Sequence, residues 1–383
     1  MIESKLPQVG TTIFTVMSRL AEEHGAVNLG QGFPDFDPPL ALCEALARHV
    51  AAGKNQYAPM AGVPALRERL AVELERAYGL KPDPETEITI TSGATEAIFD
   101  AIACVVRPGD EVIVLDPAYD SYEPAVLLQG GRVVHVPLTL PDFSVDWERV
   151  EAAFTERTRL LAINFPHNPS GAVLTPADLQ ALAALVERTG VFVLSDEVYE
   201  HIVFDGRAHQ SVLRHPGLFE RCFVVGSFGK SFHATGWKVG WVTAPAALTR
   251  EVRKVHQFVT FATSTPAQHA LAEVLASHPG HLNELGPFYQ AKRDRFRDLL
   301  AGLPLQLLPV AGAYFQLADY SALSELDDVT FARQLTTETG VAAIPLSPFY
   351  AQPNHARLVR FCFCKEDATL VRAAERLHTL RAR

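Results

Sequence analysis

The sequence has few cysteines and no long apolar run. Its five cysteines are spread over 383 residues, and this odd, scattered set is typical of proteins in a reducing compartment. No stretch reaches the roughly 20 apolar residues that a membrane span requires. The first ten residues have no basic segment followed by an apolar one, so no secretory leader is expected. We therefore expect a cytoplasmic protein without a membrane partner.

The sequence also lacks a strong excess of one charge. It has 34 basic and 44 acidic residues, a formal net charge of -10, and no run of five like charges. Partners such as nucleic acid or an anionic membrane would require a strongly basic surface, so neither is expected. Cys362 and Cys364 are separated by one residue, too few for the usual zinc spacing. We interpret them as core thiols that point to one face of a strand, with metal binding as the alternative.

The sequence does have a large apolar fraction, and its strand and helix patterns alternate regularly. With 48% hydrophobic residues, the chain is long enough for two domains. Between residues 87 and 245, short β-branched segments alternate with helical patterns, which indicates an α/β fold with a mostly parallel sheet and helices on both faces. Seven strands are predicted, at residues 87–91, 111–115, 132–136, 159–163, 191–194, 222–225 and 239–243.

The two ends of the chain differ from this centre. Residues 1–44 are rich in Pro and Gly, and we expect them to be loosely structured. Residues 286–383 alternate helical and strand patterns, as an α+β unit does. We assign residues 1–44, with an N-terminal arm, and 284–383 to a smaller domain, and residues 45–283 to the large domain.

Polar groups with chemical potential follow five of the predicted strands. In open α/β sheets, ligands bind beyond the carboxyl ends of the strands. Each segment alone is compatible with an ordinary turn or helix cap, but together they offer what one pyridoxal ring and its phosphate need. The segments are Ser92-Gly93-Ala94-Thr95, Asp116-Pro117-Ala118-Tyr119, Asn168-Pro169-Ser170-Gly171, Ser195-Asp196-Glu197-Val198-Tyr199 and Ser227-Phe228-Gly229-Lys230.

Lys230 is the most informative residue of this set. It stands among small residues at a strand end, where partial desolvation lowers the pKa of the amine and leaves it able to form a Schiff base. Lys238, eight residues later, supplies a cation for a phosphate. Asp196 would be costly to bury without a partner, and a pyridinium N–H is one such partner. These three residues predict pyridoxal 5'-phosphate as the cofactor.

At these positions the sequence resembles the class I/II aminotransferases of the aspartate aminotransferase superfamily, fold type I. The resemblance extends over nearly the whole chain. Within the superfamily it is most similar to the branch of methionine aminotransferases, glutamine–phenylpyruvate aminotransferases and kynurenine–oxoglutarate transaminases. The supporting motifs are Gly30-Gln31-Gly32-Phe33-Pro34-Asp35, Asn55-Gln56-Tyr57, Tyr122-Glu123-Pro124, His233-Ala234-Thr235-Gly236-Trp237-Lys238 and Arg360-Phe361-Cys362-Phe363, with four of the strand-end segments above.

The resemblance implies a role for each cofactor-binding residue. Lys230 would form the Schiff base and Asp196 would hold the pyridine nitrogen. Asn168 and Tyr199 would bond the ring oxygen, and Tyr119 would stack on the ring. The phosphate would be held by Gly93, Ala94, Thr95, Ser227 and Lys238, and by Tyr57 from the partner subunit of a homodimer.

The resemblance also implies a substrate site for an amino acid and a 2-oxo acid. Arg360 would receive the α-carboxylate through a guanidinium fork, with help from Gly32 and Asn168. Phe14 and the partner's Phe261 would line a pocket for a neutral or aromatic side chain. Motif matching assigns no second arginine to a distal carboxylate, which argues against a dedicated aspartate enzyme.

Four other functions remain open on the sequence. A β-lyase of cysteine conjugates or cystathionine would use the same cofactor and lysine, and an N-succinyldiaminopimelate aminotransferase would need a longer pocket. An effector-sensing protein could bind the cofactor without turnover, although such a regulator would carry a basic DNA-binding module. A nicotinamide dehydrogenase is disfavoured because no Gly-x-Gly-x-x-Gly follows a strand and opens a helix.

Overall fold

The structure is a computed structural model that describes residues 2–352 and 355–381. Its centre is a seven-stranded sheet in which β8 is antiparallel to both neighbours and every other pair is parallel. The predicted α/β fold with a mostly parallel sheet is therefore confirmed. In spatial order the strands are β2 (Ile88–Thr91), β8 (Gly240–Thr243), β7 (Cys222–Ser227), β6 (Phe192–Asp196), β5 (Thr158–Asn164), β3 (Glu111–Asp116) and β4 (Arg132–Pro137).

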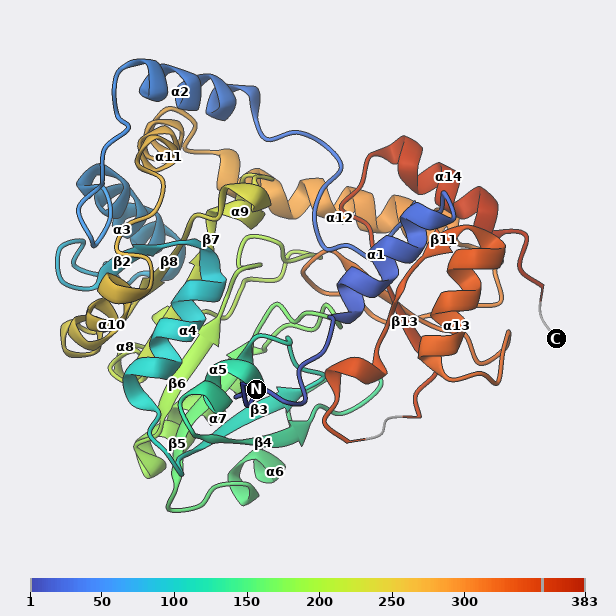
Figure 1. Cartoon of the computed structure of the whole chain (residues 1–383), viewed down its shortest axis with the longest axis horizontal. Coiled ribbons are helices and arrows are strands. Elements are labelled where there is room, and N and C mark those ends of the chain that lie inside the picture. The colour runs from blue at the N-terminus through green and yellow to red at the C-terminus, as the bar shows by residue number, and fades with distance from the viewer. Residues whose placement is uncertain (1, 353–354, 382–383) are drawn as a thin grey trace.

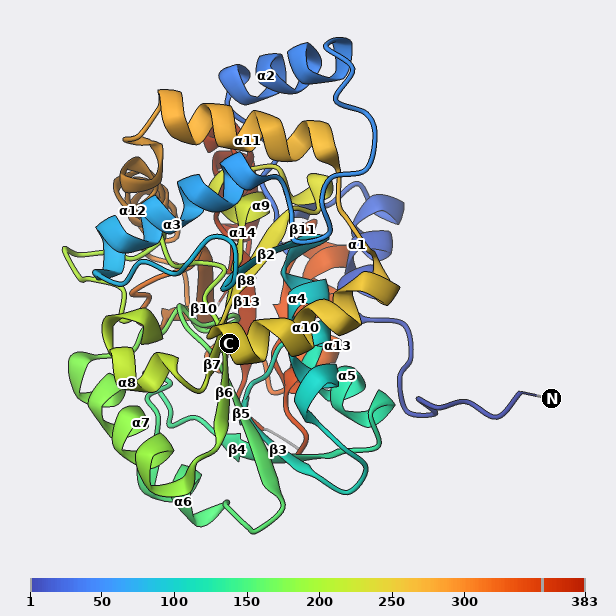
Figure 2. The same cartoon turned by 90° about the vertical axis from the view of Figure 1, so that its left-hand side faces the viewer.

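Both faces of this sheet are apolar and covered by helices (Figures 1 and 2). In β3, Val112 and Val114 pack with helices α4, α5 and α10, whereas Ile113 and Leu115 belong to the larger core on the opposite face. This is the alternation that a strand buried on both sides requires. The helices of this part are α3 (Pro64–Tyr78), α4 (Gly93–Val105), α5 (Tyr122–Leu128), α6 (Trp147–Ala152), α7 (Pro176–Thr189), α8 (Pro216–Phe219), α9 (Phe228–Ser231), α10 (Ala246–Val259) and α11 (Thr265–Ser277).

A second, antiparallel sheet lies beside the first part, on the right of Figure 1. Its strand order is β12-β13-β10-β9, and the parallel pair β1–β11 lies next to it. The elements are β9 (Gln306–Leu307), β10 (Phe315–Asp319), β11 (Val341–Ala342), β12 (Ile344–Pro345), β13 (Leu358–Cys362), α12 (His281–Leu299), α13 (Asp328–Gln334), which continues as a π-helical turn (Leu335–Thr339), and α14 (Asp367–Leu377).

The prediction that residues 1–44 are loosely structured is wrong. They contain α1 (Ile13–Glu23), β1 (Val27–Asn28) and the start of α2 (Leu40–Ala51). The Thr12 side chain caps α1 by accepting from the Thr15 N–H, and β1 is held by the distant strand β11, with Val27 opposite Val341. Pro and Gly therefore mark the connections of this segment, not its whole length.

The pairing of β1 with β11 joins a segment near the start of the chain to one near its end. The exact division stays a prediction, and both of its limits fall inside a helix, α2 and α12. Residues 2–11 extend away from the helices in Figure 2, and most of them are exposed. Among the described residues, none of the helices combines the length and apolar character of a membrane span.

Cys362 and Cys364 are fully buried, and their Sγ atoms lie 3.1 Å apart. The interpretation of both as core thiols on one face is confirmed. These buried thiols lie two and four residues after Arg360, a predicted substrate-binding residue.

Candidate active site

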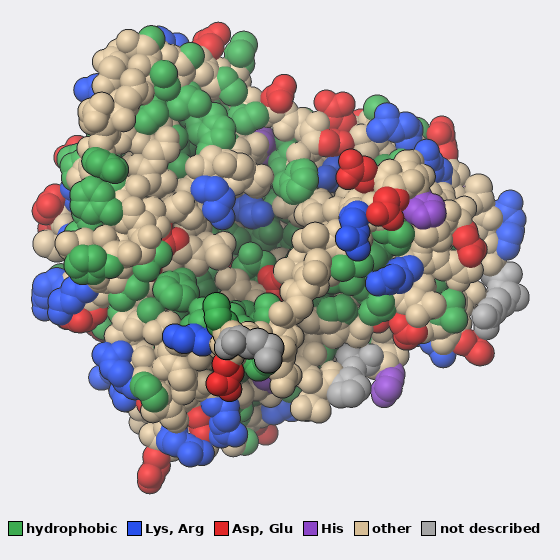
Figure 3. All heavy atoms as spheres, viewed as in Figure 1, with side chains coloured by type: hydrophobic (Ala, Val, Ile, Leu, Met, Phe, Trp, Pro, Cys, Tyr) green, Lys and Arg blue, Asp and Glu red, His purple; other side chains and the backbone are tan. Residues whose placement is uncertain are grey.

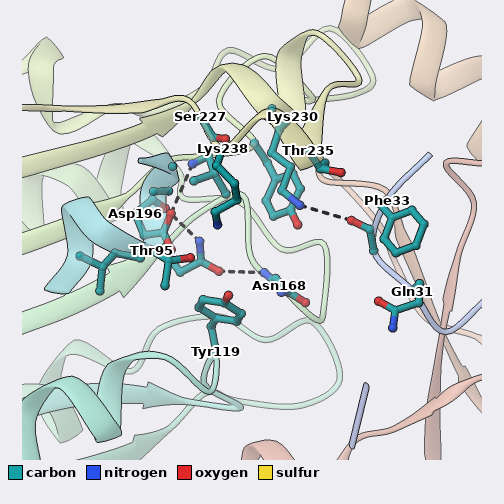
Figure 4. A pocket seen from close by; sticks show the side chains of 18 of the residues that line it. Gln31, Phe33, Thr95, Tyr119, Asn168, Asp196, Ser227, Lys230, Thr235 and Lys238 are labelled. Atoms are coloured by element: carbon teal, nitrogen blue, oxygen red, sulfur yellow. Dashed lines mark hydrogen bonds between the residues drawn. The ribbon is translucent and has the colours of Figure 1, made fainter. Parts of the chain in front are cut away.

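A cavity of about 330 Å³ lies where the carboxyl ends of the central strands meet β10 and β13. It opens on the face shown in Figure 3, which is hollowed between the two parts of the molecule. Figure 4 shows side chains from several strand ends pointing into it. The sequence-predicted residues that line it are Phe14, Gly32, Gly93, Ala94, Thr95, Tyr119, Asn168, Asp196, Tyr199, Ser227, Lys230, Lys238 and Arg360.

Lys230 stands on the short helix α9, directly after β7. Its Nζ donates a hydrogen bond to the Gly32 carbonyl oxygen at 3.2 Å and lies 5.5 Å from the ring centre of Tyr199. Burial lowers the pKa of the Lys230 amine. The structure therefore provides an amine with a reduced proton affinity that faces a cavity.

Asp196 ends β6 and faces the same cavity as Lys230 (Figure 4). The Tyr122 hydroxyl donates to its Oδ2 at 2.6 Å, and the Val198 N–H donates to its Oδ1 at 3.4 Å. Burial raises the pKa of Asp196 to about 6, and these two donors and the Lys230 charge oppose the rise. A buried acidic group with a raised pKa thus faces the cavity.

The start of α4 forms one end of the cavity. Gly93 has φ +76°, and a Cβ there would lie 3.2 Å from Cε and Nζ of Lys238. Lys238 is itself in the left-handed region, with φ +55°, which is uncommon for a residue other than glycine. The first N–H groups of a helix lack partners within the helix. Together with the Lys238 ammonium and the Ser227 side chain, they can hold an anion.

Arg360 lies on β13 at the other end of the cavity and is only 1% exposed. Its NH1 and NH2 groups donate to the Asn168 side-chain oxygen at 2.8 Å and to the Gly30 carbonyl at 2.7 Å. Within the described part of the chain, its Nε has no hydrogen-bond partner. The guanidinium lies between the rings of Phe14 and Phe315, at 5.1 and 4.1 Å. This buried cation therefore has donor capacity left for an anion.

Residues 30–33 form a strap across the cavity, and its main-chain oxygens hold cationic side chains. The Gly30 oxygen accepts from Arg360, the Gly32 oxygen from Lys230, and the Phe33 oxygen from the Lys365 Nζ at 2.7 Å. The Tyr314 hydroxyl also donates to the Gly32 oxygen, at 2.8 Å. The strap thus connects the predicted catalytic lysine with the predicted carboxylate receptor.

Tyr57 and Phe261 do not line this cavity. Their rings contact each other edge-on with centroids 5.5 Å apart, and Tyr57 is 84% exposed. The sequence assigns both to the site of a partner subunit, and that assignment stays a prediction.

Sequence reasoning missed several residues of the site. Asn164 ends β5 and could have been found by the strand-end rule, and Gln31 and Phe33 stand in a motif that resembles the family. Phe315 lies on β10, far along the sequence from the strands of the central sheet, and its own segment has no pattern that predicts a place in the site. The missed lining residues are Gln31, Phe33, Ile98, Asn164, Val198, Gly229, Thr235, Val239 and Phe315.

A second group of buried charges lies between α4 and α10 and does not line the cavity. His256 Nδ1 lies 2.8 Å from Glu96 Oε1, and its Nε2 donates to the Met60 carbonyl oxygen at 3.0 Å. Asp100 is fully buried, and neither of its carboxylate oxygens has a hydrogen-bond partner in the described part of the chain. Burial and the nearby Glu96 raise the pKa of Asp100 to about 8. We call these three residues the α4–α10 cluster.

The sequence matches the family model of "Aminotransferase class I and II" over residues 24–377. The chain belongs to this family. The aminotransferase is 56% identical over 378 residues to the methionine aminotransferase of Escherichia coli, covering 99% of this chain and 98% of that protein. A crystal structure of an Escherichia coli protein with methionine aminotransferase function matches with a TM-score of 0.97 at 55% identity, over 99% of this chain and 100% of the other.

Two further relatives represent other substrates. A probable N-succinyldiaminopimelate aminotransferase of Mycobacterium tuberculosis is 41% identical over 397 residues, covering 100% of this chain and 99% of that protein. Kynurenine–oxoglutarate transaminase 1 of mouse is 38% identical over 394 residues, covering 94% and 93%. The family, the fold type and the branch that the sequence resembles are therefore confirmed.

Proposed function

We propose that this aminotransferase uses pyridoxal 5'-phosphate to move the amino group of a neutral or aromatic L-amino acid to a 2-oxo acid. Amino acids of the methionine, glutamine, phenylalanine and kynurenine type are the expected donors. The observation that carries the proposal is that Lys230, Asp196 and Arg360 face one cavity whose far end is the N-terminus of α4.

The residues present fit this cofactor. The donors around Lys238 suit its phosphate, Asp196 suits a protonated ring nitrogen, and Lys230 suits its aldehyde. The Asn168 side-chain oxygen is already bonded to Arg360, which leaves the Asn168 NH₂ group to donate to the ring oxygen beside Tyr199. Tyr119 would lie against the ring. Ser227 and the Gly93, Ala94 and Thr95 groups would complete the phosphate site.

When bound, pyridoxal phosphate supplies an aldehyde for the amino acid and a ring that accepts electrons from the bonds at Cα. With the cofactor bound, Lys230 Nζ would take a proton from Cα as general base and deliver it as general acid to the former aldehyde carbon of the cofactor, a transfer worth about 10²–10⁴-fold. The lowered pKa of Lys230 leaves more of the amine unprotonated for this task. Asp196 holds the proton on the ring nitrogen, and Arg360 fixes the substrate carboxylate. Both half-reactions use one site, which predicts ping-pong kinetics.

The apolar wall supports a neutral or aromatic side chain. Phe14 and Phe315 lie beside the Arg360 guanidinium, where the residue attached to the bound α-carboxylate would lie. The similarity to methionine aminotransferase agrees with this class. N-succinyldiaminopimelate is the second candidate, because the Mycobacterium tuberculosis relative matches over the whole chain.

We also propose a homodimer with shared sites, located in the cytoplasm. The support for the dimer is the exposure of three aromatic side chains: Tyr57 and Phe261, whose rings contact each other, and Phe258, which is 85% exposed. In the dimer, Tyr57 would reach the partner's phosphate site and Phe261 the partner's substrate pocket. The location rests on the cysteine usage of the sequence alone.

Replacing the predicted catalytic lysine is the direct test. Lys230→Ala should bind the cofactor without a covalent bond and lose amino transfer, because the other lysine that lines the cavity in the described part of the chain, Lys238, lies beside Gly93 at the start of α4. The measurements are oxo-acid-dependent turnover and the absorbance of the protein after borohydride reduction. Lys254→Ala, on the exposed side of α10 and paired with Glu251, is the control and should keep full activity.

A panel of amino donors tests the substrate class. Methionine, glutamine, phenylalanine and kynurenine should exceed aspartate and N-succinyldiaminopimelate, and two oxo acids should be compared as acceptors. Wild-type turnover by Lys230→Ala would overturn the proposed mechanism. Release of pyruvate and ammonia from a cysteine conjugate, in place of amino transfer, would replace the proposed activity by β-elimination.

A further inference from the structure

Tyr122 contacts a predicted catalytic group without touching the cavity. It is the first residue of α5, is 2% exposed, and is absent from the cavity lining. Its hydroxyl donates to Oδ2 of Asp196 at 2.6 Å. A carboxylate accepts only, so the phenol must be the donor in this bond whenever Asp196 is ionised.

The turn that follows β3 explains how Tyr122 reaches Asp196. The Tyr122 N–H donates to the Tyr119 carbonyl oxygen, and the two rings meet edge-on with centroids 5.8 Å apart. One buried side chain therefore supports both Tyr119, the predicted stacking residue, and Asp196, the predicted partner of the ring nitrogen.

The remaining groups near Asp196 leave its second oxygen available. Among the described residues, Oδ1 receives only the long bond from the Val198 N–H, at 3.4 Å. Lys230 on α9 favours the ionised carboxylate through its charge, and Glu197 in the same loop opposes it. A short bond from a phenol to an ion is among the stronger hydrogen bonds in proteins, so Tyr122 is the strongest local contact that favours the anion.

We propose that Tyr122 is a positioning residue that keeps Asp196 ionised and directs its free oxygen to the ring nitrogen of the cofactor. This inference rests on the proposed function, since it requires a pyridine nitrogen in the cavity. Tyr122 acts through Asp196 and does not itself contact the ring.

The test compares two ligands on the cofactor-free protein. One is pyridoxal 5'-phosphate, and the other is its analogue with a C–H group in place of the ring nitrogen. Tyr122→Phe should weaken pyridoxal phosphate about tenfold, because a charge-assisted bond is lost, and should leave the affinity for the analogue unchanged. The dissociation constants are measured by quenching of protein fluorescence.

Tyr78→Phe is a matched control. The Tyr78 hydroxyl donates to the Glu200 side chain in a buried site outside the cavity, so a tyrosine hydroxyl is again removed from a buried bond to an acidic residue. This variant should bind both ligands as the wild type does. The ratio of the two affinities is internal to each protein, so a general loss of stability in Tyr122→Phe does not alter it.

The outcomes separate the two hypotheses. If Tyr122→Phe weakens both ligands equally, or neither, the positioning role is wrong while the proposed function stands. If the wild-type protein does not bind pyridoxal phosphate, the proposed function is wrong and the role of Tyr122 falls with it.

Discussion

The cavity, which adjoins the N-terminus of α4, and the α4–α10 cluster, which lies between that helix and α10, are two regions of buried charge. Asp196 and Asp100 are both almost fully buried, and burial raises the pKa of both, to about 6 and about 8. Asp196 has two donors and faces open space, whereas Asp100 has no hydrogen-bond partner in the described part of the chain and faces His256. A shifted pKa is therefore a poor marker of function unless a cavity lies in front of the group.

The α4–α10 cluster has a structural role that its contacts explain. Because His256 Nε2 donates to a carbonyl oxygen, its Nδ1 can bond the ionised Glu96 only as an N–H. Glu96 accepts in turn from the Ser92 N–H just before α4; burial raises the pKa of Glu96, but the bonds from His256 and Ser92 outweigh it and lower this pKa. The cluster thus stabilises α4, the helix whose N-terminus faces the cavity. Its charged groups, Glu96 and His256, bond to other groups of the protein.

Replacing each aspartate by asparagine should separate the two regions most strongly. Asp196→Asn should lower kcat/KM by about 10³-fold, because an amide cannot stabilise the positive ring nitrogen as a preorganised anion does. Asp100→Asn should keep kcat within about twofold, since it faces no reacting group. Steady-state kinetics of both variants, with melting temperatures as a check of folding, test this. Equal losses in the two variants would contradict the distinction.

Arg360→Lys sharpens the comparison at the other end of the cavity. A lysine keeps the positive charge but loses the fork, so we expect kcat/KM to fall by about 10²-fold, mainly through a higher KM. Arg293 provides the control, since its guanidinium is bidentate to Asp205 away from the cavity. Arg293→Lys should alter the melting temperature and leave KM unchanged. An unchanged KM in Arg360→Lys would remove Arg360 from carboxylate binding.

The smallest expected effect concerns the pH dependence of stability. From about pH 4 to about pH 8 the folded protein holds a proton on Asp100 that the unfolded chain has released. The contribution of Asp100 to stability should therefore fall as the pH rises through this range, because the folded state binds more protons at this group. Asp100→Asn removes this contribution, so its free energy of unfolding should fall less than that of the wild type between pH 5 and pH 8. Urea-unfolding curves of both proteins at each pH measure this difference. An equal fall in the two proteins would contradict the prediction.

Much of the fold could be predicted because many of its helices and strands have a clear pattern in their own sequence. β3 and β5 are continuous apolar segments, and α7 begins with Thr175 as N-cap and Pro176 at its first position. The two-residue strand β1 could not be predicted, since Val27–Asn28 becomes a strand only through β11, more than 300 residues later. Helix α1 was not predicted for a different reason: the Pro and Gly residues around it favoured a loop.

The residues of the candidate site that stand at strand ends could be predicted from the strand pattern of the sequence, whereas the others could not. Asp196 is the last residue of β6 and Lys230 lies on α9 directly after β7, so the geometry of a parallel sheet brings them together. Tyr122 lies in a motif that resembles the family, yet its contact with Asp196 depends on the path of the turn after β3. Phe315 belongs to the second sheet and contacts Tyr199 beside the first. No sequence pattern in either segment predicts that the two sheets pack together there.

The strap of residues 30–33 anchors Arg360, Lys230 and Lys365 by its peptide oxygens, which every amino acid carries. Evolution can therefore exchange Gln31 and Phe33, whose side chains line the cavity, without loosening these anchors. Gly30 and Gly32 lack that latitude, because an added methyl group would press on Ile344 and Phe315 at 3.1 and 3.2 Å. Relatives with other amino donors should accordingly diverge at the second and fourth positions of this tetrapeptide and keep glycine at the first and third.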